Sequence, residues 1–242
     1  MLSALLALYS SLNFAACNDP PAPKVNWFGC DLSERDLSRA DLREAIFSNT
    51  LLHRTVLADA ILTGADFENA RAEGTDFHNA QLSHARLINA NLRKANFTGA
   101  NLDGARFNRS DLRDALLQNV TGEKASFYDA NMALTQLEGS SLPNASFEQA
   151  HLTGADFSKA VLTQTRFNDA TLEKARFAGA NLQKSKLNTA NLSGADLSNT
   201  DLTQADLTGA NITGTIFKDA ILANTAWIDR RRCKPASIGT CQ

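Results

Sequence analysis

Residues 190–199 read ANLSG and then ADLSN, and this five-residue pattern determines the architecture of the chain. Each unit has a small residue, a polar residue and a large apolar residue at its centre, followed by two residues of other kinds. The pattern continues without a change of register through forty units, whose central residues fall at every fifth position from Leu32 to Trp227. A fixed period indicates a core built by stacking similar units.

The order of residues within a unit predicts its local geometry. The small residue and the central residue are two apart, so in an extended segment both point to the same side and the polar residue between them points away. The residue two after the centre is often glycine or asparagine, which accept the positive φ of tight turns. We therefore expect each pentapeptide to be a short strand followed by a corner.

The repeated A(D/N)LXX motif resembles that of the pentapeptide-repeat proteins, and the resemblance covers about four fifths of the chain. It implies an all-β fold, the right-handed quadrilateral parallel β-helix, in which four pentapeptides make one coil. Forty units then make about ten coils, and an interstrand spacing of about 4.8 Å predicts a rod roughly 45–50 Å long.

Phenylalanine placement supports four sides independently of this resemblance. Counted from the unit of Leu32, every central phenylalanine lies in an even-numbered unit. A triangular coil would scatter the even units over every side, whereas a square coil keeps them on two opposite sides. The phenylalanines are therefore expected to stack on two faces: Phe47, Phe67, Phe77, Phe97, Phe107, Phe127, Phe147, Phe157, Phe167, Phe177 and Phe217.

Four segments follow along the chain: residues 1–17, an apolar segment; 18–30, a linker and N-terminal cap; 31–229, the repeat; and 230–242, a C-terminal cap. Residues 2–16 are apolar and uncharged, which is typical of a signal peptide, although a helix capping the rod is the alternative. The sequence FAAC at residues 14–17 resembles a bacterial lipoprotein cleavage box, which makes Cys17 a candidate for lipidation. Lipidation would leave Cys30 unpaired, whereas an unmodified Cys17 could form a disulfide with it.

The C-terminal cap resembles a tail seen in exported pentapeptide-repeat proteins. That resemblance implies a disulfide between Cys233 and Cys241, a spacing that can close in an oxidising compartment. Trp227 would close the end of the core. Together with the signal-like segment, this predicts an exported protein, either periplasmic or anchored in a membrane as a lipoprotein, or lumenal in a photosynthetic organism.

Catalytic and metal-binding motifs are missing from the sequence. The histidines share no ligand spacing with cysteine or carboxylate, and no insertion interrupts the repeat to form a pocket. We expect neither an enzyme nor a cofactor, metal or small-molecule substrate. The net charge of −2, from 24 basic and 26 acidic residues, argues against a nucleic-acid binder and against a strongly acidic mimic.

The leading hypothesis is an exported structural or protein-interaction rod. The alternative is a DNA-mimicking topoisomerase (gyrase) inhibitor that gives drug or toxin resistance, as some pentapeptide-repeat proteins are. An enzyme would require chemistry that the sequence does not show.

A partner surface is predicted from the residue just before each centre. Four cations fall on one side of a square coil, Arg86, Arg106, Arg166 and Lys186, and Asp36, Asp76, Asp156 and Asp196 fall on the opposite side with Arg176. The basic face would dock an unknown protein or an anionic surface, or both faces would serve only solubility. Apolar residues at the same position near the ends, such as Ile61 and Ile221, are covered either by the terminal segments or by a second copy, so the protein is a monomer or a homodimer.

Overall fold

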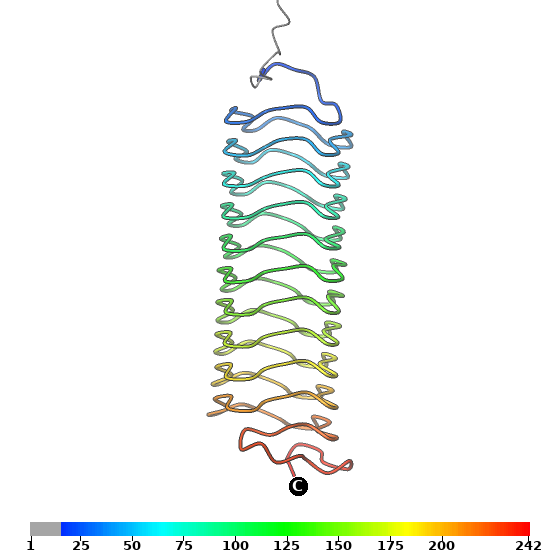
Figure 1. The fold of residues 1–242 in the computed structure, drawn as a ribbon, viewed down its shortest axis with the longest axis vertical. Helices are drawn as coiled ribbons and strands as arrows, with labels where there is room; N and C mark the ends of the chain where they lie inside the picture. The colour runs from blue at the N-terminus through cyan, green and yellow to red at the C-terminus, as the bar shows by residue number, and fades with distance from the viewer. Residues whose placement is uncertain (1–15) are drawn as a thin grey trace, which may run out of the picture.

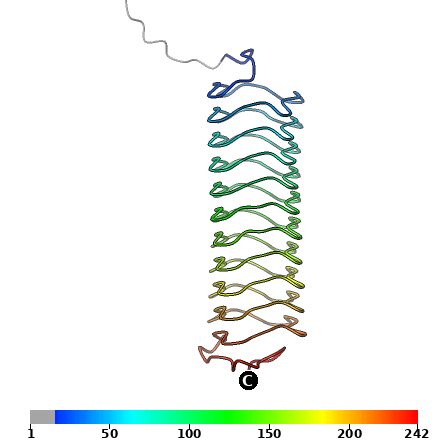
Figure 2. The same ribbon diagram turned by 90° about the vertical axis from the view of Figure 1, so that its right-hand side faces the viewer.

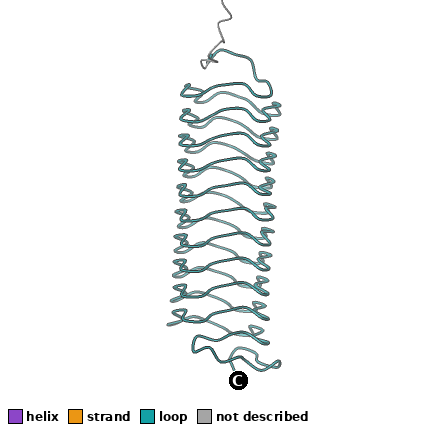
Figure 3. Cartoon of the chain, viewed as in Figure 1, coloured by secondary structure: helices purple, strands orange, loops and turns teal. Residues whose placement is uncertain are grey.

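The computed structural model describes residues 16–242, which form a straight rod of stacked coils (Figures 1 and 2). Residues 1–15 lie outside the described part, so the predicted signal segment falls outside it except for its last two residues. The described residues contain no helix and no strand of several residues (Figure 3). Instead, one residue of each pentapeptide forms an isolated β-bridge and a two-residue turn follows. The expected short strand is thus reduced to a single bridged residue.

Parallel bridges join residues twenty positions apart, from Asn26–Ile46 at one end to Asp206–Ala226 at the other. One coil therefore uses four pentapeptides, and bridged residues form columns along the rod, which we call ladders. The bridged residue is the outward one, just before each centre. Backbone hydrogen bonds tie successive coils, as where the Phe67 amide donates to the Arg86 carbonyl at 2.7 Å. The chain is an all-β solenoid.

The corner of each unit has left-handed backbone geometry. Every fifth residue from Lys24 to Asn224 has a φ between 53° and 71°. Glycine and asparagine fill many of these positions, as predicted, but residues as unsuited as Leu134 and Thr189 adopt the same geometry. A left-handed non-glycine residue costs roughly 1–2 kcal/mol. The repeated hydrogen bonds between coils must therefore outweigh this local cost.

Aromatic rings fill two opposite sides of the core, as the even-numbered units predicted. Rings twenty residues apart stack, as in Phe47 and Phe67, whose centroids lie 4.5 Å apart with planes 3° from parallel. Rings ten residues apart meet edge to face across the core, as in Phe67 and Phe77 at 5.7 Å and 83°. Both arrangements are the favourable ones for aromatic pairs.

Gly122 occupies a central position without filling it, and a local bulge is the expectation from the sequence. That expectation is wrong, because the ladder continues in register from Asn101 through Thr121 to Ser141. Leu142 of the next coil occupies the space, since a Cβ on Gly122 would lie 2.7 Å from its Cδ2 atom. The neighbouring coil thus compensates for the missing side chain.

The N-terminal end of the core is closed by Trp27, which is fully buried and lies 5.4 Å from the ring of Phe47. The sequence predicts that Trp27 and Phe28 together cover this end of the core, but Phe28 is 53% exposed. A disulfide joins Cys17 to Cys30 with the Cα atoms 5.4 Å apart. The Arg35 guanidinium also donates to the Cys17 carbonyl at 3.2 Å. The segment preceding the coils is thereby fastened to the first coil.

The C-terminal segment turns back across the last coil. It forms two antiparallel bridges, Ile221–Ile238 and Ala226–Arg232, and a disulfide joins Cys233 to Cys241. Trp227 is only partly buried and lies 5.4 Å from the ring of Phe217. Terminal coverage is incomplete, because Ile216, Ile221 and Ile238 remain 51%, 43% and 60% exposed.

Candidate interaction surface

The four predicted cations occupy a single ladder. Consecutive bridges run along it in the order Asp66, Arg86, Arg106, Ser126, Ser146, Arg166, Lys186 and Asp206. We call Arg86, Arg106, Arg166 and Lys186 the basic ladder. Their common direction follows from the twenty-residue coil, because residues at multiples of twenty share one side.

Within the described part of the chain, ion pairs offset the positive charge of two residues of the basic ladder but not of the other two. Arg86 binds Asp66 at 3.0 Å and Glu68 at 2.6 Å, and Arg166 lies 3.3 Å from Glu148. Arg106 and Lys186 are exposed, and neither forms a salt bridge with any residue in the described range 16–242. The positive charge is therefore most available at these two residues.

We call Asp36, Asp76, Asp156 and Asp196, on the opposite face, the acidic ladder. It has a structural role that the sequence did not predict. Asp36, Asp76, Asp156 and Asp196 each accept a hydrogen bond from the backbone amide two residues later, at 2.9–3.0 Å. Such contacts define an Asx-turn. The signal was present, because aspartate and asparagine recur at this one position of the repeat.

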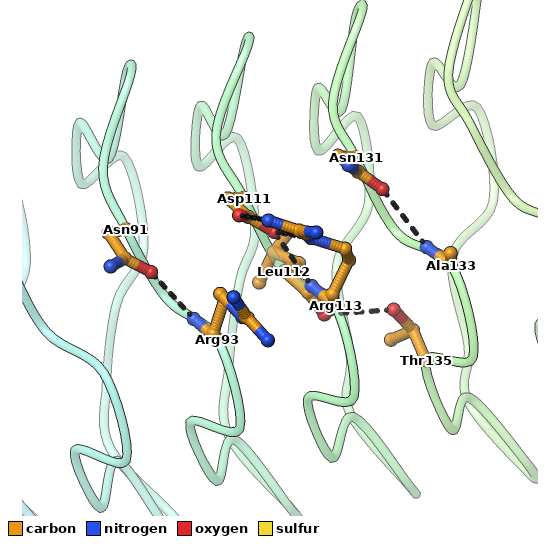
Figure 4. Close-up of polar contacts among 8 residues, drawn as sticks. All are labelled: Asn91, Arg93, Asp111, Leu112, Arg113, Asn131, Ala133 and Thr135. Atoms are coloured by element: carbon orange, nitrogen blue, oxygen red, sulfur yellow. Dashed lines mark hydrogen bonds and ion pairs between the residues drawn. The ribbon is translucent and has the colours of Figure 1, made fainter.

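Figure 4 shows this turn on three neighbouring coils. The side chains of Asn91, Asp111 and Asn131 each accept a hydrogen bond from the backbone amide two residues later, at 3.3, 3.2 and 3.4 Å. In the same view the buried Thr135 hydroxyl donates to the carbonyl of Leu112 in the preceding coil at 3.0 Å. Asparagine serves as well as aspartate, so the turn itself does not require charge.

At some of these turns the residue is an aspartate whose ionised form is favoured by hydrogen bonds, as at Asp111 and Asp36. Partial burial opposes ionisation of Asp111, but hydrogen bonds from the Arg113 side chain and amide outweigh it and lower the pKa of Asp111. The Ser38 hydroxyl and amide likewise lower the pKa of Asp36. A carboxylate with a lowered pKa in the folded state stabilises the fold above its unfolded pKa, and this stabilisation is lost as pH falls through the folded pKa.

Shallow hollows lie along the corners of the rod. One of about 420 Å³ is lined by Glu34, Glu73 and Lys94 among others, and one of about 370 Å³ by Glu138 and Lys159 among others. Both mix carboxylates with cations. A hollow of about 390 Å³ beside the basic ladder has no carboxylate in its lining: Asn144, Gln164, Arg166, Lys184 and Lys186.

No group of three or more histidine, cysteine, aspartate or glutamate side chains in residues 16–242 is arranged to hold a metal ion. The same residues include no helix with the length and hydrophobicity needed to span a membrane. Cys17, the candidate for lipidation, forms a disulfide with Cys30. The two cysteines of the C-terminal cap, Cys233 and Cys241, form the second disulfide. A disulfide and a lipid thioether cannot share the sulfur of Cys17.

Two family models match the chain. The model for the pentapeptide repeat region matches residues 23–97 and 150–227, which together exceed half of the chain. The model for eight copies of the pentapeptide repeat matches residues 105–142 and 130–169. Comparison with curated proteins gave no match.

Solved structures similar to the chain are also pentapeptide repeat proteins. HetL, involved in heterocyst differentiation regulation in the cyanobacterium Nostoc sp. strain PCC 7120, is 30% identical over 87% of this chain and 90% of its own, with a TM-score of 0.41. A protein of the Arabidopsis thaliana thylakoid lumen is 29% identical over 55% of this chain and 68% of its own, with a TM-score of 0.24. Full-length QnrB1, a plasmid-mediated fluoroquinolone resistance protein, is 18% identical over 78% and 92%, with a TM-score of 0.34.

Proposed function

Because the chain belongs to the pentapeptide repeat family, we propose that it is an exported, non-catalytic interaction rod whose basic ladder docks an anionic partner. The observation that carries this proposal is the alignment of Arg86, Arg106, Arg166 and Lys186 along one side of the rod. The proposed rod has about ten right-handed coils with four sides. Its ladders hold these charges at fixed separations, which suits a docking surface.

The alternative of a DNA-mimicking gyrase inhibitor has weaker support. DNA carries one negative charge per 1.7 Å, so a duplex as long as this rod has roughly 25–30 charges. The whole chain has a net charge of only −2. In addition, the aspartates of the acidic ladder accept hydrogen bonds within their own turns.

Charge reversal tests the docking proposal. Replacing Arg86, Arg106, Arg166 and Lys186 by glutamate is expected to abolish binding to poly-L-glutamate, a soluble polyanion. Binding by the original rod should weaken with salt, because exposed charges are screened over about 8–10 Å at ordinary ionic strength.

The melting temperature is the control. It should change little, because all four side chains point outward and the lost ion pairs of Arg86 and Arg166 are surface pairs that each contribute only about 0–1 kcal/mol. Equal binding by the reversed and original rods would show that the ladder is only a solvated face.

Export is supported by the signal-like residues 2–16 and by two disulfides, since disulfides persist in oxidising compartments. We expect mass spectrometry of protein from its native compartment to show a mature chain that starts near Cys17, without Met1. A mass lower by two hydrogens in a peptide pair containing Cys17 and Cys30 would identify the disulfide, whereas an added acyl mass on Cys17 would identify the lipoprotein. An intact Met1 in a cytosolic protein would contradict export.

A further inference from the structure

The hollow beside the basic ladder lies between two columns of residues. One side consists of the corner residues Asn144, Gln164 and Lys184, whose φ values are 60°, 58° and 58°. Arg166 and Lys186, bridged on neighbouring coils, form the other side. We call these five residues the basic hollow. It occupies about 390 Å³ at the C-terminal half of the rod.

Two of the three cations in the basic hollow have no carboxylate partner in the described part of the chain. Several cations elsewhere on the rod pair with a carboxylate on the neighbouring coil, as in Lys24–Glu44 at 3.5 Å and Arg176–Asp156 at 3.3 Å. Lys184 and Lys186 have no such carboxylate within 4 Å among residues 16–242, and Arg166 has only Glu148 outside the hollow. Like charges on adjacent strands are destabilising, so an anionic ligand would relieve this repulsion.

Neutral hydrogen-bond donors complete the lining. The side-chain amides of Asn144 and Gln164 form no hydrogen bond with the described part of the protein. Amide N–H groups and ammonium or guanidinium groups are all donors to carboxylate oxygens. From this combination we infer that the basic hollow binds carboxylate side chains of an extended acidic segment of a partner protein. The inference rests on the proposed docking function and assigns it a location and a partner.

The residues around the basic hollow favour a peptide over a lipid bilayer as its partner. Binding to anionic lipid surfaces typically uses clusters of four to eight lysines or arginines. The ladder that contains Arg166 and Lys186 also contains Asp66 and Asp206, and Glu68 and Glu148 lie beside its arginines. A flat anionic membrane would meet those carboxylates, whereas a narrow segment can contact the basic hollow and avoid them.

Two double variants, each replacing two cations by glutamine, test whether the basic hollow is the binding site. The probe is a ten-residue peptide of alternating glutamate and serine with blocked ends, titrated calorimetrically into the folded rod. Lys184→Gln with Lys186→Gln is expected to weaken binding at least about tenfold, because it removes two of three cations in the hollow. The matched control, Arg71→Gln with Arg109→Gln, removes two exposed cations that lie off the basic ladder and form no salt bridge among residues 16–242, and it should change the affinity less than about twofold.

Equal weakening by both pairs would overturn the basic hollow, because binding would then follow the total charge of the rod and not the cations of the hollow. Absence of peptide binding by the unchanged rod would overturn the peptide partner, as would vesicle binding that depends on Lys184 and Lys186. Failure of the docking proposal itself appears separately, as binding of poly-L-glutamate that survives reversal of the whole basic ladder. Circular dichroism of each variant must match that of the original rod.

Discussion

Replacing Phe147 by alanine is expected to lower the free energy of unfolding by about 3–5 kcal/mol. Phe147 is fully buried, and its ring stacks between those of Phe127 at 4.8 Å and Phe167 at 5.0 Å. It also meets the edge of Phe157 at 5.5 Å. Removing the ring creates a cavity and breaks three aromatic contacts. Urea unfolding followed by circular dichroism measures the loss.

Phe147→Leu separates the effect of lost side-chain volume from that of lost ring stacking. It should lower the free energy of unfolding by about 1–1.5 kcal/mol, because most of the volume remains. The two tryptophans of the chain, Trp27 and Trp227, lie at opposite ends of the rod and report on each end separately in single-tryptophan variants. A weakened middle coil should make their unfolding transitions diverge, since each coil contacts only its neighbours. A loss below about 1 kcal/mol for Phe147→Ala would contradict a continuous stacked core.

Replacing both Cys233 and Cys241 by serine is expected to destabilise the C-terminal cap by about 2–3 kcal/mol, the loop-closure estimate for so short a loop. The cap is otherwise held by a few backbone contacts, such as Leu222 to Ser237 and Cys233 to Thr225, both at 2.9 Å. Its opening would expose the end of the core. Fluorescence of Trp227 should therefore change at a lower urea concentration than in the original protein.

Cys17→Ser with Cys30→Ala is the matched control at the other end. It should shift the transition of Trp27 and leave that of Trp227 in place, because effects in a solenoid decay away from the altered coil. A uniform shift of both tryptophans in either double variant would show that the caps act on the rod as one cooperative unit.

The architecture could be predicted because every pentapeptide repeats the same order of inward and outward residues. A small residue, an outward residue and a large apolar residue recur in one register, and the placement of residues such as Phe67 and Phe77 reveals the number of sides. The position of the basic ladder follows from the same arithmetic, since its members differ by multiples of twenty.

Contacts between coils limited what the sequence could predict. The pairing of Arg86 with Glu68 depends on how long side chains reach across neighbouring coils, and no fixed register specifies it. Compensation of Gly122 by Leu142 likewise depends on a rotamer in the next coil. Solubility is one of the roles that the sequence predicts for aspartates such as Asp76, but their carboxylates also accept the hydrogen bonds that form the turns. Lipidation and disulfide formation at Cys17 share one sequence signal, so sequence alone could not separate them.

The twenty-residue coil constrains how such a rod changes its length during evolution. Duplication of twenty residues adds one coil and about 4.8 Å, and every ladder keeps its side. Duplication of a single pentapeptide preserves the five-residue period, but it moves every later residue to the next side of the rod, a quarter turn away. If the duplication lay between residues 147 and 166, Lys186 would leave the side of Arg86, and Phe167 would leave the stack of Phe147. Only whole coils therefore preserve both the aromatic stacks and the alignment of the surface charges.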